Sequence, residues 1–212
     1  MARRGTRAGE KCNGRIVPMQ IPPESSSPLP PAQDSSVQDR AKKIRLFLMD
    51  VDGTLTDGGV CLMSLPGGDA VAELKVFNSQ DGLGLKLAHI MGIATGFITG
   101  RKSAAVLQRA KELSVEYVYM GQATKTAAFE ECLQKAGVRE SEVAYLGDDL
   151  PDMPVARRCG LAVAVADAAP EMKQICHYVT RAAGGKGAAR EVVELILKAQ
   201  QRWEEAIPRA LA

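Results

Sequence analysis

The sequence has little of several residue types and patterns on which common catalytic classes depend. It contains only two histidines, His89 and His177. Neither lies beside an acidic cluster, so a phosphohistidine route or a Ser-His-Asp triad has no natural base. The motif Gly-x-x-x-x-Gly-Lys-Ser/Thr does not occur, which excludes a P-loop nucleotide hydrolase. No run approaches the ~18 consecutive apolar residues of a membrane helix, so we expect no membrane span.

Cysteine is scarce and scattered. The five cysteines are odd in number, and no pair has the spacing of a metal site or of a closed disulfide framework. Free thiols are the default in a reducing compartment. The first residues are basic but precede no apolar stretch, so they do not resemble a signal peptide. We therefore expect a cytoplasmic protein.

Positive charge is concentrated at one end of the chain. The formal net charge is +2 at pH 7, of which residues 1–45 carry +5 and the remainder −3. A slightly acidic folded part offers no basic face, so we expect no nucleic-acid partner. The first 40 residues are rich in Pro, Ser, Gln and Arg, a composition that buries too little apolar surface to fold. We predict that residues 1–43 form a disordered N-terminal extension.

Strand and helix patterns alternate along the rest of the chain. A short apolar run at 44–49 is typical of a strand buried on both faces, and a helical pattern follows at 82–91. The alternation predicts an α/β fold with a doubly wound parallel sheet over residues 44–200, followed by a tail at 201–212. Further strands are predicted at 93–98, 117–119, 143–146, 161–165 and 178–179, and further helices at 102–113, 125–136, 152–158 and 188–206.

One segment departs from this alternation. Between residues 58 and 80 the pattern is more typical of β-strands, as at 71–77, and a turn cluster occupies 66–69. We predict a β-hairpin that projects from the sheet just after the first strand. A surface flap without function is one interpretation; covering the active site or contacting another subunit is the one we favour.

Polar side chains follow three predicted strands where each strand ends. Asp50 and Asp52 follow the first strand, Thr99 and Gly100 the second, and Asp148 the fourth. Lys125 begins a predicted helix. Ligands of doubly wound sheets bind at the carboxyl ends of the strands, so we expect these groups to meet there. Each signal alone is weak, since Asp-Gly pairs are usually turns, but together they indicate one site.

These residue types predict a magnesium-dependent phosphatase. Asp50, Asp52 and Asp148 supply the oxygen ligands that Mg²⁺ prefers. Asp50 can attack phosphorus to form an aspartyl-phosphate, and Asp52 can protonate the leaving alcohol and then deprotonate water. Thr99 and Lys125 can stabilise charge on the phosphoryl oxygens.

The chain resembles the haloacid dehalogenase superfamily and, within it, the phosphatases of 3-deoxy-D-manno-octulosonate 8-phosphate (KDO 8-phosphate). The resemblance runs from about Ile44 to Gln200. The four superfamily motifs match Asp50-Val51-Asp52-Gly53-Thr54, Thr99-Gly100, Lys125 and Gly147-Asp148-Asp149. The narrower match includes Phe77-Asn78-Ser79-Gln80-Asp81-Gly82, Ile98-Thr99-Gly100-Arg101-Lys102, Gly121-Gln122 and Tyr178 to Ala188.

The resemblance implies features that spacing does not show. It implies a homotetramer without a cap domain, in which the hairpins form a central barrel and each subunit helps close its neighbour's active site. It implies that Gly184, Gly185 and Lys186 belong to a segment that reaches into an adjacent site. It also implies substrate contacts at Asn78, Gly100, Arg101 and Arg109, with Arg101 on the sugar-acid carboxylate, and supporting roles for Asp149 and Asp152. The alternative for either arginine is an ordinary charge on a helix surface.

Two departures and three hypotheses remain at this level. The N-terminal arm is longer than the family core requires, and Thr54 stands where the subfamily commonly has Val. The leading hypothesis is hydrolysis of KDO 8-phosphate in lipopolysaccharide assembly. The alternatives are the same chemistry on a nine-carbon sialic-type acid phosphate or a small sugar phosphate, and a catalytically silent oligomerisation module. A silent copy need not retain Asp50, Asp52, Lys125 and Asp148 together.

Overall fold

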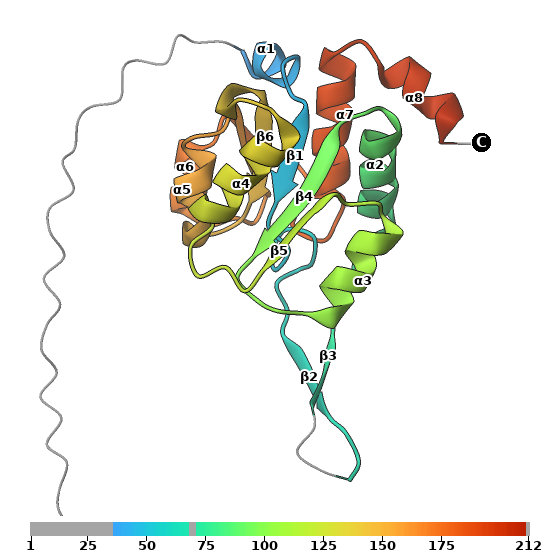
Figure 1. The fold of residues 1–212 in the computed structure, drawn as a ribbon, viewed down its shortest axis with the longest axis vertical. Helices are drawn as coiled ribbons and strands as arrows, with labels where there is room; N and C mark the ends of the chain where they lie inside the picture. Colours follow the sequence, from blue (N-terminus) through green and yellow to red (C-terminus); the bar gives the residue numbers. More distant parts are fainter. Residues whose placement is uncertain (1–35, 68–70, 211–212) are drawn as a thin grey trace, which may run out of the picture. The chain divides into compact units, whose positions relative to one another are not determined.

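A computed structural model describes residues 36–67 and 71–210 of the chain (Figure 1). The disorder predicted for the N-terminal extension therefore falls mainly outside the described residues, as does part of the turn cluster at 66–69. The first described element, α1 (Val37–Ala41), lies inside the segment predicted as an extension. It packs against α7 (Ala188–Ala199), and Ala41 is fully buried. The folded body thus begins before residue 44.

A six-stranded parallel sheet forms the centre of the body and confirms the predicted fold class. β1 is flanked by β4 on one side and β6 on the other, so the strand order changes direction at β1. Such a switch point leaves a crevice at the carboxyl ends of the strands. The order across the sheet is β5 (Tyr117–Met120), β4 (Ala94–Thr99), β1 (Leu46–Met49), β6 (Val143–Gly147), β7 (Leu161–Ala164) and β8 (Tyr178–Val179).

Helices cover both faces of the sheet, as Figure 1 shows. The three central strands β1, β6 and β7 are buried along their whole length, which explains why they read as unbroken apolar runs. No helix within 36–67 and 71–210 has the length and hydropathy to cross a bilayer. One face carries α2 (Ser79–Ile90), α3 (Ala104–Glu112) and α7, and the other α4 (Thr126–Ala136), α5 (Met153–Ala156) and α6 (Pro170–Ile175).

Local capping sets the starts of two helices beside the site. The Asn78 side chain accepts a hydrogen bond from the Gln80 backbone N–H, so α2 begins three residues earlier than predicted. The Ser103 hydroxyl accepts from the Val106 N–H at the start of α3. Short turns of 3₁₀-helix at Glu140–Glu142 and Leu150–Asp152 flank β6.

The prediction of one continuous helix over 188–206 is wrong. The helix ends at Ala199, and a second helix, α8 (Trp203–Arg209), follows. Between them Gln201 adopts a left-handed backbone conformation with φ 58°. The break directs the Gln200 side chain to the segment before β1, where its Nε2 donates to the Ile44 carbonyl at 2.7 Å. This contact joins residues far apart in the sequence, so the helical periodicity alone could not indicate it.

The predicted hairpin is present as a separate two-stranded sheet. β2 (Cys61–Ser64) and β3 (Val71–Leu74) pair antiparallel and project from the body (Figure 1). All four residues of β2 are exposed, and β3 is at most half-buried. The hairpin therefore has no core of its own within the described chain.

Candidate active site

The carboxyl ends of β1, β4 and β6 meet at a cavity of about 360 Å³. β1 is followed directly by Asp50, β4 ends at Thr99, and β6 is followed by Asp148. The structure thus brings together the acids, Thr99 and Lys125 that the sequence placed at one edge of the sheet. The lining residues are Asp50, Asp52, Thr99, Gly100, Arg101, Gln122, Ala123, Lys125, Asp148, Asp149, Pro151 and Asp152.

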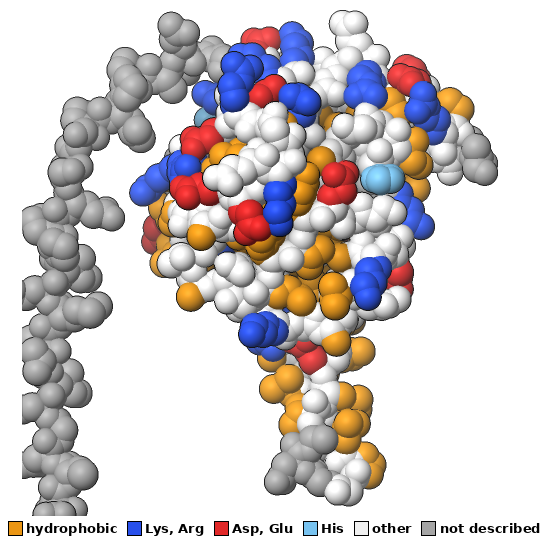
Figure 2. All heavy atoms as spheres, viewed as in Figure 1, with side chains coloured by type: hydrophobic (Ala, Val, Ile, Leu, Met, Phe, Trp, Pro, Cys, Tyr) orange, Lys and Arg blue, Asp and Glu red, His pale blue; other side chains and the backbone are white. Residues whose placement is uncertain are grey.

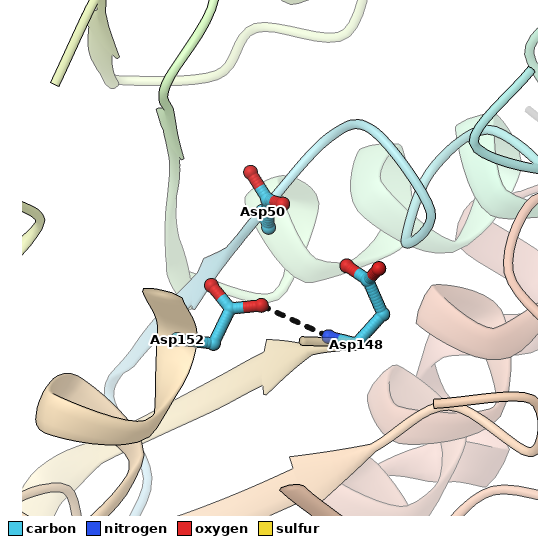
Figure 3. Close-up of side chains that lie close together, drawn as sticks. All are labelled: Asp50, Asp148 and Asp152. Carbon is cyan, nitrogen blue, oxygen red and sulfur yellow. Dashed lines mark hydrogen bonds between the residues drawn. The ribbon is translucent and has the colours of Figure 1, made fainter. Parts of the chain in front are cut away.

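Asp152 organises the floor of this cavity. Its side chain is 1% exposed. Each of its two carboxylate oxygens accepts two hydrogen bonds. Oδ1 accepts from Lys125 Nζ at 2.6 Å and from the Tyr145 hydroxyl at 2.5 Å. Oδ2 accepts from the backbone N–H of Asp148 at 2.9 Å, as Figure 3 shows, and of Asp149 at 3.3 Å. These four donors occupy the acceptor positions of a carboxylate, so Asp152 is a fixed support for its neighbours.

Lys125 joins this support to Asp50. Its Nζ lies 2.9 Å from Asp50 Oδ1, and its side chain is buried. Burial alone lowers the pKa of a lysine, but the carboxylates of Asp152 and Asp50 outweigh that effect and raise the pKa of Lys125. The ammonium therefore stays charged beside Asp50. Lys125 is the residue immediately before α4, in the connection from β5 to that helix.

The electrostatics at Asp50 and Asp148 show an excess of negative charge. Burial raises the pKa of Asp50 to about 6, against the opposing effect of Lys125. Burial, with Asp152 and Asp50 next, raises the pKa of Asp148 to about 7. The Thr54 hydroxyl donates to Asp148 Oδ1 at 2.9 Å and fixes its orientation. A bound cation would relieve the repulsion among these acids.

The acidic group fits a hard divalent cation. Carboxylate oxygens of Asp50, Asp148 and Asp152 lie within 4.8 Å of one another, and Figure 3 shows the three side chains around one space. Asp152 already holds four donors, whereas Asp50 Oδ1 meets Lys125 as an ion pair and has no partner in hydrogen-bond geometry among the described residues. Asp50 and Asp148 therefore retain lone pairs for a metal. Asp52, a ligand in the sequence hypothesis, lines the cavity but is not in this group of three.

Asp52 contacts the hairpin instead. Its Oδ1 accepts a hydrogen bond from Lys75 Nζ, just after β3. Lys75 Nζ also lies 3.4 Å from Glu73 Oε1, and Arg101 Nη2 donates to the same Glu73 oxygen at 2.8 Å. Arg101 lines the cavity, and its guanidinium is already paired within the chain.

Two other predicted substrate contacts lie away from the cavity. Arg109 donates to the Asn78 carbonyl at 3.5 Å and to Glu112 at 3.2 Å, and stacks 5.8 Å from the centre of the Phe77 ring. Asn78 caps α2 and donates to the Gly185 carbonyl at 3.3 Å. Both residues border a separate small space between α2 and α3.

The glycine-rich loop at 184–187 packs against the loop after β1 in the same chain. Gly185 N donates to the Thr54 carbonyl at 2.9 Å, and Gly184 N to Asp167 Oδ1 at 2.9 Å. A Cβ at Gly184 would lie 1.8 Å from the Gly53 carbonyl oxygen. Lys186 is exposed. The glycines therefore serve close backbone approach to the loop that carries Asp52 and Thr54.

The sequence did not predict a place at the site for Lys75, Glu73 or Tyr145, or that Gln122 and Ala123 line the cavity. Gln122 belongs to a stretch with family resemblance, and its N–H donates to the Thr99 carbonyl at 3.1 Å. Tyr145 lies in the middle of an apolar strand and is fully buried, which a strand pattern alone does not mark as functional. Lys75 and Glu73 lie in the β-pattern of the hairpin, where charges usually face solvent. No local signal identified them.

Comparison with known proteins identifies the family of the chain. The sequence model of the haloacid dehalogenase-like hydrolases matches residues 106–192. The 3-deoxy-D-manno-octulosonate 8-phosphate phosphatase of Escherichia coli (strain B / BL21-DE3) is 44% identical over 172 residues, which cover 81% of this chain and 89% of that protein. The chain belongs to this phosphatase family.

Solved structures of the family have the same fold. The 3-deoxy-D-manno-octulosonate 8-phosphate phosphatase of Moraxella catarrhalis, in complex with a magnesium ion, a phosphate ion and KDO, superposes with a TM-score of 0.77 at 42% identity. The match covers 82% of this chain and 97% of that one. A probable phosphatase of Pseudomonas syringae gives a TM-score of 0.77 at 45% identity, over 83% and 97% of the two chains.

The contact between the glycine-rich loop and the loop after β1 gives a stability prediction. Gly184→Ala places a methyl group against the Gly53 carbonyl, where neither backbone can move without loosening the site. We expect a loss of about 1–3 kcal/mol in the free energy of unfolding, measured by urea titration. Gly100→Ala is the matched control, because its Cβ meets only the Gln122 carbonyl at 3.7 Å. Equal stability of the two variants would contradict the packing argument.

Proposed function

We propose that the protein is a magnesium-dependent phosphatase that hydrolyses KDO 8-phosphate to KDO and phosphate, as a step in lipopolysaccharide biosynthesis. The observation that carries this proposal is the juxtaposition of Asp50, Lys125, Asp148 and Asp152 in one cavity. Family membership supports the substrate, since the relatives are phosphatases of KDO 8-phosphate. A silent oligomerisation module would have no need of this buried charge arrangement, which is unfavourable in itself.

Asp50 is the proposed nucleophile. One of its oxygens forms a bond to phosphorus while the bond from phosphorus to the sugar oxygen breaks, which gives an aspartyl-phosphate. Lys125, held by Asp152, favours the ionised form of Asp50 and stabilises negative charge on the phosphoryl oxygens. Thr99 is buried at the end of β4 and lines the same cavity. In this proposal its hydroxyl donates a hydrogen bond to the phosphoryl group.

Asp52 is the proposed proton donor and acceptor. It gives a proton to the departing sugar oxygen. It then takes one from the water whose attack breaks the bond between phosphorus and Asp50 and releases phosphate, so protons balance over the cycle. We assign Asp50 and Asp148 as the side chains that hold Mg²⁺. When bound, Mg²⁺ neutralises charge on the phosphate and so permits an anionic nucleophile to approach. Asp152 keeps these acids in place, and Asp149 caps the 3₁₀ turn that carries Asp152.

Substrate selection is assigned to Arg101 and its surroundings. Arg101 lines the cavity beside Gly100 and can pair with the carboxylate of a sugar acid, in exchange for its present partner Glu73. Arg109 and Asn78 would act indirectly, through the packing of α2 and α3 and through Gly185. Lys186 is the exposed residue of the 184–187 loop and is our candidate for contact with the site of a neighbouring subunit.

We further propose that the hairpin mediates assembly into a homotetramer. Figure 2 shows apolar side chains along the projecting hairpin. Val60, Leu62, Met63, Val71, Leu74 and Val76 are each more than half exposed. A two-stranded sheet with so much apolar surface is marginal alone and gains stability by packing against other copies. The number four rests on the family resemblance.

The cellular location we propose is the cytoplasm. Cys61, Cys132, Cys159 and Cys176 are all free thiols in the described part of the chain, as expected in a reducing compartment. The catalytic domain in this proposal extends from α1 to α8, slightly longer than the 44–200 range expected from sequence.

Removal of the nucleophile or of the metal tests the chemistry. Asp50→Asn should lower kcat/KM at least roughly 1,000-fold and leave the far-UV circular dichroism spectrum unchanged, because no carboxylate remains to attack phosphorus. EDTA should stop phosphate release, and added Mg²⁺ should restore it. A panel of KDO 8-phosphate, nine-carbon acid phosphates and simple sugar phosphates measures the preference. Activity that survives EDTA, or a preference for another substrate, would refute the corresponding part.

The carboxylate assignment is tested at Arg101. Arg101→Met should lower kcat/KM for KDO 8-phosphate about 10- to 100-fold, the effect of losing hydrogen bonds to a charged group. The loss for a sugar phosphate without a carboxylate should stay within about 3-fold. Arg101→Lys keeps the charge without the two-pronged geometry and should fall between. Equal losses on both substrates would assign Arg101 to a general role.

Assembly is tested by light scattering coupled to size-exclusion chromatography. The wild type should elute with about four times the 22.6 kDa mass of one chain. Leu62→Glu introduces charge on the exposed apolar hairpin and should shift the protein to smaller species at the same concentration. Leu107→Glu, at an exposed leucine of α3 away from the hairpin, is the control that should leave the mass unchanged. A monomeric wild type would end the shared-site proposal.

A further inference from the structure

Lys75 is a buried cation without a role in the mechanism described above. It lies just after β3, at the base of the hairpin, and its side chain is only 3% exposed. A buried ammonium is unfavourable unless charged partners compensate it. Its partners are Asp52 Oδ1, with which it forms an ion pair and a hydrogen bond, and Glu73 Oε1 at 3.4 Å.

The two acids of the motif after β1 are therefore paired with different lysines. Asp50 has Lys125, which is anchored by Asp152 on the floor of the cavity. Asp52 has Lys75, which comes from the hairpin side. This division matches the division of tasks, since one acid attacks phosphorus and the other handles protons.

The contact with Lys75 distinguishes the two oxygens of Asp52. An ammonium group only donates hydrogen bonds, so the oxygen it binds acts as an acceptor. The other oxygen, Oδ2, is buried and has no hydrogen-bond partner among the described residues. Asp52 lines the cavity, and the contact with Lys75 fixes where its carboxyl group lies in the cavity wall.

We propose that Lys75 is a positioning residue that holds the Asp52 carboxyl group by Oδ1 at the wall of the cavity. In the first step Asp52 gives its proton to the leaving-group oxygen as the bond from that oxygen to phosphorus breaks. In the second step Asp52 takes a proton from the water whose attack breaks the bond between phosphorus and Asp50. This inference rests on the proposed function, because it presupposes that Asp52 is the acid and base of a phosphatase.

Glu73 supports the same arrangement from the other side of Lys75. It accepts from Arg101 Nη2 at 2.8 Å while lying 3.4 Å from Lys75 Nζ. The ammonium is thus held between two carboxylates, one on the hairpin and one in the motif. Movement of the base of the hairpin would move Lys75, and with it Asp52.

The experiment compares two leaving groups in the full-length protein with Mg²⁺ present. A sugar or other alkyl phosphate needs a proton on its leaving oxygen, whereas 4-nitrophenyl phosphate has a stable leaving anion and needs little help. The quantity compared is kcat/KM, which reports only the steps up to departure of the leaving group. Asp52→Asn serves as the reference for loss of the proton donor.

Lys75→Met should lower kcat/KM for the alkyl phosphate about 10- to 100-fold, a part of the effect of general acid catalysis. The loss for 4-nitrophenyl phosphate should be below about 3-fold, as with Asp52→Asn. Lys75→Arg keeps the cation and should recover part of the alkyl phosphate activity. Lys102→Met, which removes an exposed lysine next to Arg101, should change neither substrate by more than about 2-fold.

The other outcomes are distinct. Equal losses on both substrates, with a lowered melting temperature, would assign Lys75 a structural role and overturn the inference. A raised KM for both substrates at unchanged kcat would make it a phosphate-binding residue and also overturn it. If Lys75→Met does not fold, Lys75→Arg decides: its losses must differ between the two leaving groups. A wild type that hydrolyses neither substrate would instead refute the proposed function itself.

Discussion

The buried carboxylate of Asp152 is the interaction on which the rest of the site depends. It lies under the ends of β1 and β6 and accepts from Lys125, Tyr145 and two backbone N–H groups. A buried charge with one partner removed typically costs about 3–5 kcal/mol, so this group holds its neighbours firmly. Lys125 is thereby fixed beside Asp50, and the backbone of Asp148 is fixed opposite it. These side chains are held in place by the chain itself.

Backbone packing supplies a second constraint on the same loop. The backbone of Gly184 and Gly185 packs directly against the backbone of loop 53–56. The two segments are too close for a side chain at either glycine. Asp81, buried in α2, accepts from the Gly187 and Arg190 N–H groups and so fixes the start of α7. The C-terminal part of the chain therefore holds the loop after β1 in the same subunit. Contacts from loop 184–187 thus connect the loop after β1 with α2 and the start of α7.

The sequence predicted the parts of this structure that local pattern determines. The central strands were recognisable because they are buried on both faces, and the acids because they follow those strands directly. It did not predict the break at Gln201, the partner of Asp52 or the contact of Gly184 with Gly53. Each of these depends on residues brought together only by the fold. Asp152 is intermediate: resemblance suggested a supporting role, but only its four donors explain why it is unsuited to bind metal.

The hairpin combines an exposed apolar part with a charged base that contacts the cavity residues Asp52 and Arg101. Its outer part exposes apolar side chains from Val60 to Val76, which favours contact with other copies of the chain. Its base carries Glu73 and Lys75, which must stay close to Asp52 and Arg101. The six-stranded sheet cannot supply these charges, since its central strands are filled with apolar residues. A projecting element held by ion pairs can expose apolar side chains along its strands while its base stays paired with Asp52 and Arg101. In the proposed tetramer, packing of the hairpins would therefore steady the acid that handles protons.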